Sequence, residues 1–310
     1  MDLYKALVAN AKPIAIEPSE TSYFSQPQAG LDPRLFRNET LSGSVRDGIL
    51  GVLFGHLSAH YSNPQAYTHV WLAGSGVSYL WAANRSPADL DCLVGIDFVG
   101  FRRANEKFAR FSDQDIASML NDGFREELHP VTDNYLNEFE LTFYVNTKTD
   151  IREIKPYAAY SLTDNNWTVE PTDSQPRVSE AWDKKIQRDV TFSVEILDRY
   201  TDALSKIGSA TNSSARLNAE AALKLAVEQG AALFETIHHG RGAAFSPIGQ
   251  GYMDYDNYRW QAGKRSGVIQ ALKQLKDIST KTRQQFEAQT YGMTLPDASV
   301  LVRRAALHKS

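Results

Sequence analysis

The spacing of apolar residues becomes helical throughout in the last part of the chain, and this change constrains the fold more than any other feature. Before residue 168, runs such as FELTFYVN at 139–146 alternate apolar and polar positions, as a strand with one buried face does. After residue 180, apolar residues recur every three or four positions, which is typical of amphipathic helices. The intervening segment, TVEPTDSQPRVSE, is rich in proline and turn-favouring residues. We therefore predict an α+β protein with two domains, residues 1–175 and residues 176–310.

The first domain is expected to contain one long helix and three strands after an irregular lead-in over residues 10–40. The helix is predicted within residues 40–61, and the strands at residues 68–75, 89–98 and 139–146. Helices are predicted throughout the second domain. One is expected to end at His238-His239-Gly240, and another to run roughly from Tyr258 to Lys276.

Composition excludes several classes of protein. Of 310 residues, 42% are apolar, yet no apolar run is long enough to span a membrane, so no membrane partner is expected. The N-terminal residues lack the basic start and apolar block of a secretion signal. A single cysteine, Cys92, allows no internal disulfide framework and no zinc site built on cysteine pairs. These features favour a cytoplasmic protein.

Charge is distributed unevenly between the two predicted domains. Residues 1–175 hold 14 Lys+Arg and 23 Asp+Glu, a balance of −9, and residues 176–310 hold 19 and 14, a balance of +5. This asymmetry fits a metal-binding side joined to a phosphate-binding side, and it equally fits solvated helix faces that differ in charge.

The segment WLAGSGVSYLWAANRSPADLDCLVGIDF contains most of the candidate catalytic and ligand-binding residues. An apolar strand ends at Gly74-Ser75, thirteen residues follow, and Asp89-Leu90-Asp91 opens the next strand. Alternate side chains of a strand share a face, so Asp89 and Asp91 point the same way, about 6–7 Å apart along the strand. Two carboxylates so placed can bind a pair of Mg²⁺ ions about 3.5–4 Å apart.

The Gly-Ser turn is a candidate phosphate-binding site. Glycine allows the backbone of residue 74 to approach a ligand, and the Ser75 hydroxyl with nearby backbone N–H groups can bind phosphate oxygens. Residues 75–83 are a candidate short helix, in which Ser78 is a second candidate contact.

A third carboxylate usually completes a two-metal centre. Glu140 is the first choice, because it is an acid between Phe139 and Leu141 on a strand that is otherwise buried on one face. Glu138 has the same parity but lies nearer the strand start, and Asp150 follows a predicted turn. Both remain alternatives. Asp97 lies about 20 Å beyond Asp91 along an extended strand and is interpreted as a loop acid.

This arrangement resembles the polymerase-beta-like nucleotidyltransferase superfamily. Its signature is Gly-Ser after an apolar strand, then Asp-apolar-Asp, then a third acid on a later strand. Here Ala73-Gly74-Ser75, Asp89-Leu90-Asp91 and Phe139-Glu140-Leu141 match these parts in order. The resemblance implies an α/β catalytic domain with a mixed sheet, followed by an all-helical domain. The spacer is long, and the Arg-Gly that often follows Gly-Ser in the antibiotic-modifying branch is absent, which argues against an aminoglycoside substrate.

By this resemblance, the protein transfers a nucleoside monophosphate from an NTP, such as ATP, to an acceptor hydroxyl and releases pyrophosphate. Asp89, Asp91 and Glu140 are implied to bind Mg²⁺ or Mn²⁺, and Ser75 to contact the triphosphate. The acceptor stays open between RNA, a nucleotide, a protein and a small molecule. The alternative function is a non-catalytic nucleotide- or RNA-binding sensor or scaffold on the same fold.

The second domain offers one candidate phosphate contact. Lys264 lies in DYDNYRWQAGKRSGVIQALKQL, where aromatic and basic residues interleave at a predicted helix start. Two interpretations stay open: Lys264 is a cation that contacts the triphosphate, or the segment is an ordinary helix start with charged surface residues.

Overall fold

The computed structural model describes residues 3–24, 26–81, 87–147, 150–171, 178–246 and 248–292. These residues divide into two compact units. The sheet unit comprises residues 22–171, and the helical unit comprises residues 3–21 together with 178–292. The sequence analysis assigned residues 1–175 to one domain, whereas the structure groups residues 3–21 with the helices.

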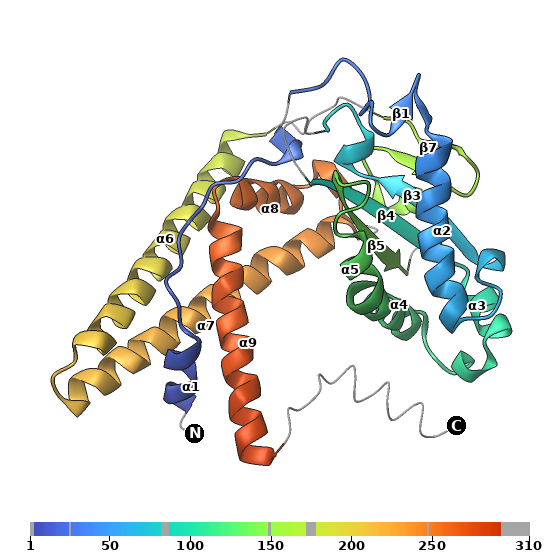
Figure 1. Cartoon of the computed structure of the whole chain (residues 1–310). Coiled ribbons are helices and arrows are strands. Elements are labelled where there is room, and N and C mark those ends of the chain that lie inside the picture. The colour runs from blue at the N-terminus through green and yellow to red at the C-terminus, as the bar shows by residue number, and fades with distance from the viewer. Residues whose placement is uncertain are drawn as a thin grey trace. The chain divides into compact units, whose positions relative to one another are not determined.

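The sheet unit is built on a mixed sheet (Figure 1). Within the described residues, five strands follow the order β5-β4-β3-β6-β7. They are β3 (Thr68–Ala73), β4 (Ala88–Ile96), β5 (Phe139–Asn146), β6 (Ala159–Ser161) and β7 (Asn166–Val169). Strands β4 and β5 are parallel, and every other neighbouring pair is antiparallel. The three predicted strands and the α+β class are confirmed.

One face of this sheet is closed by helices. The long helix α2 (Gly43–His60) buries Ile49 and Leu53, and α4 (Asp113–Gly123) buries Ile116, in the same apolar cluster as alternate residues of the strands. The strand residues in that cluster include Val70, Leu72, Leu90, Cys92, Val94, Leu141 and Phe143. Helix α4 continues into a short π-helical segment, η5 (Phe124–Leu128), and then α5 (His129–Thr132). This closed face is the core of the unit.

The opposite face of the sheet is only partly covered. The 3-10 helix η6 (Ile151–Ile154) packs its two isoleucines against Trp71, Ala73 and Ala159. The part of this open face made by β4 and β5 is not fully covered by η6, and polar and apolar residues alternate along these two strands as a half-buried strand requires.

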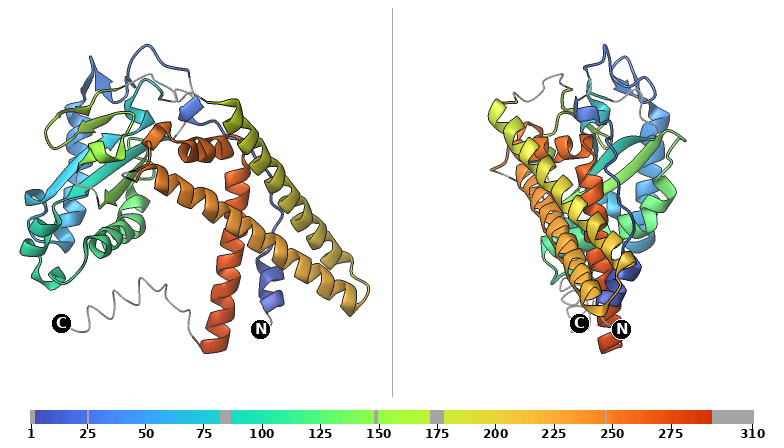
Figure 2. Two further views of the ribbon diagram at one scale, coloured as in Figure 1. Left: turned by 180° about the vertical axis from the view of Figure 1, so that it is seen from behind. Right: turned by 90° about the vertical axis from the view of Figure 1, so that its left-hand side faces the viewer.

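The helical unit contains helices that pack on one another through apolar stripes. It consists of α1 (Leu3–Asn10), α6 (Glu180–Ser209), α7 (Ser213–Ala244), α8 (Tyr255–Arg265) and α9 (Val268–Tyr291). Figure 2 shows α6 and α7 lying side by side. Helix α1 joins this core through Leu7, which clusters with residues of α6, α7 and α9. The segment after α1 also contacts this core, since the Tyr200 hydroxyl of α6 donates a hydrogen bond to the Lys12 carbonyl at 2.7 Å.

Two predicted helix boundaries in this unit are wrong. Helix α7 does not end at His238-His239-Gly240 but continues to Ala244. The helix predicted from Tyr258 to Lys276 is two helices, because Gly267 adopts a φ of 82° between α8 and α9. That conformation is left-handed and favours glycine, so the chain turns there.

A membrane-spanning helix was not expected, and none is found in the described parts of the chain. Each helix there is too short or too polar to cross a bilayer.

Candidate functional site

Two of the predicted acids are partners across adjacent strands. In the parallel pairing of β4 with β5, Asp89 is the register partner of Glu140, and Asp91 is the partner of Thr142. Register partners project from the same face, and neighbouring strands lie about 4.8 Å apart. Asp89, Asp91 and Glu140 therefore share the open face, while Leu90 and Leu141 between them are buried in the core.

One acid on each of the two strands has a polar side-chain contact. The Thr142 hydroxyl donates a hydrogen bond to Asp91 Oδ1 at 3.1 Å. On β5, Glu140 Oε1 lies 3.3 Å from Nε2 of His129, and both side chains are more than a third exposed. His129 begins α5, which packs next to β5, so this contact depends on the helix that follows η5. The sequence analysis identified neither Thr142 nor His129 as an orienting residue.

The Gly74-Ser75 turn lies beside these acids. Strand β3 is antiparallel to β4, and Ala73 is the register partner of Asp91. Gly74 adopts a φ of 94° with a ψ of −160°, a conformation that side chains other than hydrogen disfavour. The chain then forms the short 3-10 helix η3 (Ser75–Val77). The turn and the acids thus meet at one end of β3 and β4.

Gly76 explains how the turn approaches the strand so closely. A Cβ at this position would lie 2.9 Å from the Asp89 carbonyl oxygen, which is closer than real Cβ atoms come. Only glycine therefore lets η3 pack on the backbone of Asp89 without a shift. Sequence reasoning missed this requirement, although a second glycine two residues after Gly74 was a visible signal.

Ser78 differs from the other predicted phosphate contacts. Its side chain is completely buried. The hydroxyl donates to the Ser75 carbonyl at 3.0 Å and accepts from the Leu80 N–H at 3.1 Å. It stabilises the end of the turn and faces the interior. The short helix expected over residues 75–83 is limited to the single 3-10 turn η3 among the described residues.

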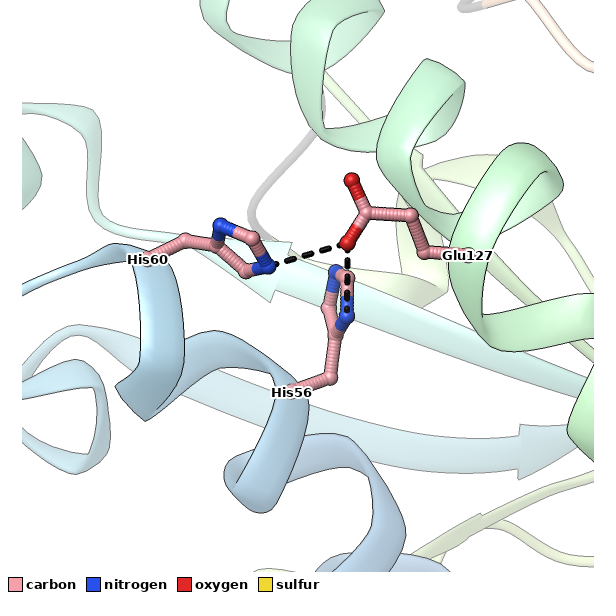
Figure 3. Close-up of side chains that lie close together, drawn as sticks. All are labelled: His56, His60 and Glu127. Atoms are coloured by element: carbon pink, nitrogen blue, oxygen red, sulfur yellow. Dashed lines mark ion pairs between the residues drawn. The ribbon is translucent and has the colours of Figure 1, made fainter.

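The donor set on the open face is chemically suited to a hard cation. Carboxylate oxygens are the protein ligands that Mg²⁺ prefers. In the described residues, two groups bring three potential ligand atoms within 4.8 Å of one another; Asp89, Asp91 and Glu140 do not form such a group. One group is His56, His60 and Glu127 (Figure 3). The other is Glu235, His238 and His239 in α7.

The alternatives for the third acid have other partners. Glu138 Oε2 lies 3.3 Å from Arg34 Nη1, just before β5 begins. Asp150 accepts a hydrogen bond from the Arg152 N–H at 2.9 Å and so caps η6. Glu140 alone among the three is the register partner of Asp89.

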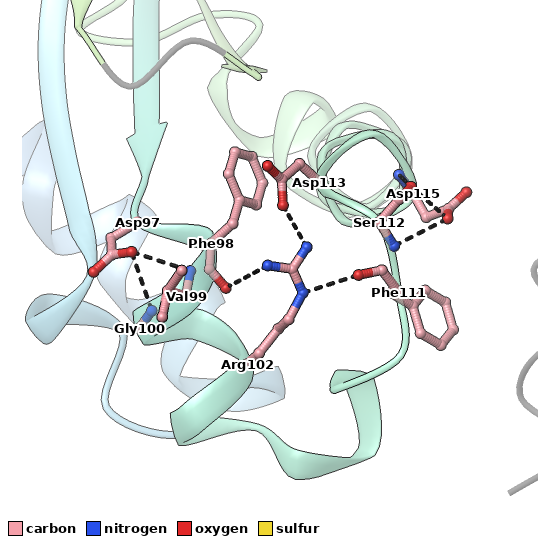
Figure 4. Close-up of polar contacts among 9 residues, drawn as sticks. All are labelled: Asp97, Phe98, Val99, Gly100, Arg102, Phe111, Ser112, Asp113 and Asp115. Carbon is pink, nitrogen blue, oxygen red and sulfur yellow. Dashed lines mark hydrogen bonds and ion pairs between the residues drawn. The ribbon is translucent and has the colours of Figure 1, made fainter.

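Asp97, interpreted from the sequence as a loop acid, caps a helix. Its carboxylate accepts hydrogen bonds from the backbone N–H groups of Val99 and Gly100 at 3.0 and 3.1 Å, at the start of α3 (Phe98–Ala104) (Figure 4). Arg102 in the same helix pairs with Asp113 at the start of α4. These contacts hold the loop after β4, which is a structural role.

Lys264 belongs to the last turn of α8 in the helical unit. The aromatic and basic residues that precede it pack α8 against α6. Arg259 binds both carboxylate oxygens of Asp189, at 2.6 and 2.8 Å, and the Tyr258 hydroxyl donates to Asp183 at 2.8 Å. The cluster around Lys264 therefore joins two helices through partly buried polar pairs.

A groove of about 610 Å³ occupies the other end of the open face. His69 and Trp71 of β3 stack in it with ring centroids 5.9 Å apart, and Asp164 and Trp167 also line it. Trp71 pairs with Leu93 in β4, two residues beyond Asp91, so the groove begins about 7 Å along the strand from the acids. The shared face of His69 and Trp71 follows from alternation within β3 and is readable in the sequence, but the residues of other segments that line the groove are not.

Comparison of the chain with protein-family models, with curated proteins and with solved structures finds no match.

Proposed function

We propose that the sheet unit is a metal-dependent nucleotidyltransferase. It transfers a nucleoside monophosphate from an NTP to an acceptor hydroxyl and releases pyrophosphate. One observation carries the proposal: the pairing of Asp89 with Glu140, which aligns these acids and Asp91 on one open sheet face. At the same strand end, the Gly74 turn packs against the backbone of Asp89.

The supporting chemistry follows from the residues on this face. Asp89 and Asp91 would hold Mg²⁺ or Mn²⁺, and Glu140 would complete one of the sites, since all three offer hard oxygen donors. Bound divalent ions neutralise phosphate charge and lower the pKa of a coordinated hydroxyl. Glu140 takes up the proton that the acceptor hydroxyl loses. Thr142, which bonds to Asp91, restricts the rotation of that carboxylate.

In this proposal the turn after β3 binds the triphosphate. Gly76 allows the backbone of η3 to lie against Asp89, so phosphates bound along the turn are next to the acids. The antiparallel pairing of β3 with β4 and the parallel pairing of β4 with β5 provide the mixed sheet on which the polymerase-beta-like signature is arranged. That Lys264 of α8 binds phosphate stays a prediction.

The decisive experiment uses the full chain with each labelled NTP, Mg²⁺ and a cell extract, followed by measurement of pyrophosphate and identification of what becomes labelled. We expect Asp89→Asn and Asp91→Asn each to lower pyrophosphate release by at least about 100-fold, with unchanged circular dichroism. Tyr144→Phe is the matched control, because Tyr144 is exposed on the same face of β5.

Full activity in either aspartate variant would refute the assignment. Magnesium-dependent NTP binding by calorimetry without pyrophosphate release would also refute it, and would favour the nucleotide-binding sensor or scaffold instead.

A further inference from the structure

Two histidines and a glutamate converge where α2 meets the end of α4. His56 and His60 are four residues apart on α2, so they lie on the same helix face. Glu127 comes from η5. Its Oε2 lies 3.0 Å from His60 Nε2 and 3.8 Å from His56 Nδ1, as Figure 3 shows. Three potential ligand atoms thus point to one place.

The spacing of these atoms fits a small tetrahedral cation. Zinc binds imidazole nitrogen and carboxylate oxygen at about 2.0–2.2 Å, which places neighbouring ligand atoms about 3.3 Å apart. The two observed separations, 3.0 and 3.8 Å, lie on either side of that value. All the ligand atoms of the cluster are within 4.8 Å of one another. Little rearrangement is needed for the three side chains to bind one ion, with water as a fourth ligand.

The surroundings of the cluster are enclosed on one side and open on the other. The His56 side chain is 11% exposed, whereas those of His60 and Glu127 are 43% and 55% exposed. Gly123 lies beside the buried imidazole, where a Cβ would make an ordinary van der Waals contact with His56 Nε2 at 3.6 Å. The site therefore has a packed base and a route for an ion from solvent.

Glu127 belongs to a π-helical turn. Such turns are rare, and they often occur at functional positions, where they re-aim a side chain. Here the π-turn connects α4 to α5 and presents Glu127 to the histidines of α2. The register of a regular helix through these residues would alter that presentation.

The second cluster, in α7, is less suited to a cation. Its Glu235 carboxylate forms an ion pair with Lys276, and this contact is the main reason that the Glu235 pKa is lowered. Burial is the main cause of the lowered His238 pKa, and the charges of Lys276 and Arg241 lower it further. Fixed positive charges beside the donor atoms would repel a metal ion. At His56 the neighbouring charged groups that affect the pKa are His60 and Glu127 themselves.

We propose that His56, His60 and Glu127 form a site for a divalent transition-metal ion, zinc, which ties α2 to η5. Both elements pack on the closed face of the sheet, through Leu53, Leu57 and Phe124 among others. The site is separate from the acids of the open face and does not depend on the proposed transferase activity. Its role is to clamp two helices that cover the core.

The test measures zinc binding by the full chain after treatment with a chelator. Calorimetry is expected to give one tight site per chain, and Co²⁺ is expected to give the strong visible absorption of four-coordinate cobalt. His60→Ala and Glu127→Gln should each weaken binding by about tenfold or more. Both side chains are substantially exposed, so these variants should fold.

Three controls locate the ion. Glu126→Gln removes a neighbouring exposed carboxylate of the same helical turn and should leave zinc affinity unchanged. His239→Ala in the α7 cluster and Asp91→Asn on the open face should also leave it unchanged. Zinc should raise the Tm of the wild type and not of Glu127→Gln.

Two results would overturn the proposal. One is the absence of zinc binding to the wild-type chain at micromolar concentrations. The other is unchanged affinity in both His60→Ala and Glu127→Gln, particularly with a loss in His239→Ala or Asp91→Asn, which would place the ion elsewhere.

Discussion

The two faces of the central sheet are made by alternate residues of the same strands, yet their surroundings differ completely. On the closed face, Leu90 and Leu141 are at most 1% exposed and pack under α2 and α4. On the open face, Asp91 is exposed, while Asp89 and Glu140 are half-buried. A shift of one residue in either strand would exchange these sets. The strong demand for apolar burial on one face thus fixes the direction of the polar side chains on the other.

Within single strands, the core residues and the proposed catalytic residues thus lie on opposite faces. Substitutions on the closed face should change the free energy of unfolding, and substitutions on the open face should change activity with little effect on folding. Four predictions, from the largest expected effect to the smallest, test where this separation holds.

The largest effect is expected for Leu90→Ala, between the two catalytic candidates. Removing a fully buried leucine side chain should lower the free energy of unfolding by about 2–5 kcal/mol, measured by urea denaturation. Tyr144→Ala, at a 54% exposed position of β5, is the control for the open face and should cost much less. Equal costs at the two positions would contradict the separation.

The second largest effect is expected at Gly76, where a substitution should affect both stability and activity. In Gly76→Ala, the new Cβ would press on the Asp89 carbonyl, so the turn must move by a few tenths of an ångström. We expect a loss of about 1–3 kcal/mol in stability together with reduced pyrophosphate release. Gly51→Ala is the matched control. Gly51 is an exposed glycine of α2 with no atom near the position of a Cβ, so this change should stabilise by roughly 0.5–1 kcal/mol. Loss of stability in Gly51→Ala, or none in Gly76→Ala, would contradict this account.

A smaller effect confined to activity is expected for Thr142→Val. The substitution removes the hydroxyl that donates to Asp91 Oδ1 and retains the β-branched shape that suits a strand. The Mg²⁺ concentration for half-maximal activity should rise by about tenfold, while the urea midpoint stays constant. An unchanged Mg²⁺ dependence would show that this hydrogen bond does not orient the acid.

The smallest effect concerns pH and the helix that covers the closed face. Burial, and secondarily the neighbouring His60, lower the pKa of His56 below its ordinary value of 6.5, and Glu127 acts in the opposite direction. The unfolded chain therefore binds this proton at a higher pH than the folded chain. The free energy of unfolding should fall as the pH drops below 6.5.

In His56→Gln, the decline between about pH 7.5 and pH 5.5 should be shallower than in the wild type, with both measured in chelator. His238, whose pKa is also lowered, remains in both proteins and cancels in the difference. Identical slopes would show that His56 titrates alike in the folded and unfolded chains.

The local pattern of residues predicted the site elements well. Strand β5 has the predicted bounds, and β3 and β4 differ from the expected ranges only at their ends. The shared face of Asp89 and Asp91 follows from two-residue alternation, which depends only on neighbours in the chain. The pairing of Asp89 with Glu140 could not be predicted, because parallel register is set by contacts between segments separated by about fifty residues.

Other features were hidden for similar reasons. The sequence marked Ser78 as a candidate ligand, but the turn that follows η3 buries its hydroxyl. The apolar pattern across Gly267 looked continuous, although the left-handed conformation there separates α8 from α9. The cluster of His56, His60 and Glu127 joins residues about seventy positions apart, and only the first two share a readable helical spacing.

The amino-acid sequence by itself determined which segments form strands and helices and which side chains share a face. Those properties arise from the geometry of consecutive residues and the burial of apolar side chains. Only the tertiary structure decided which acids become neighbours, which polar groups are buried, and where Glu127 meets α2. Those outcomes depend on strand register and helix packing, which distant parts of the chain fix together.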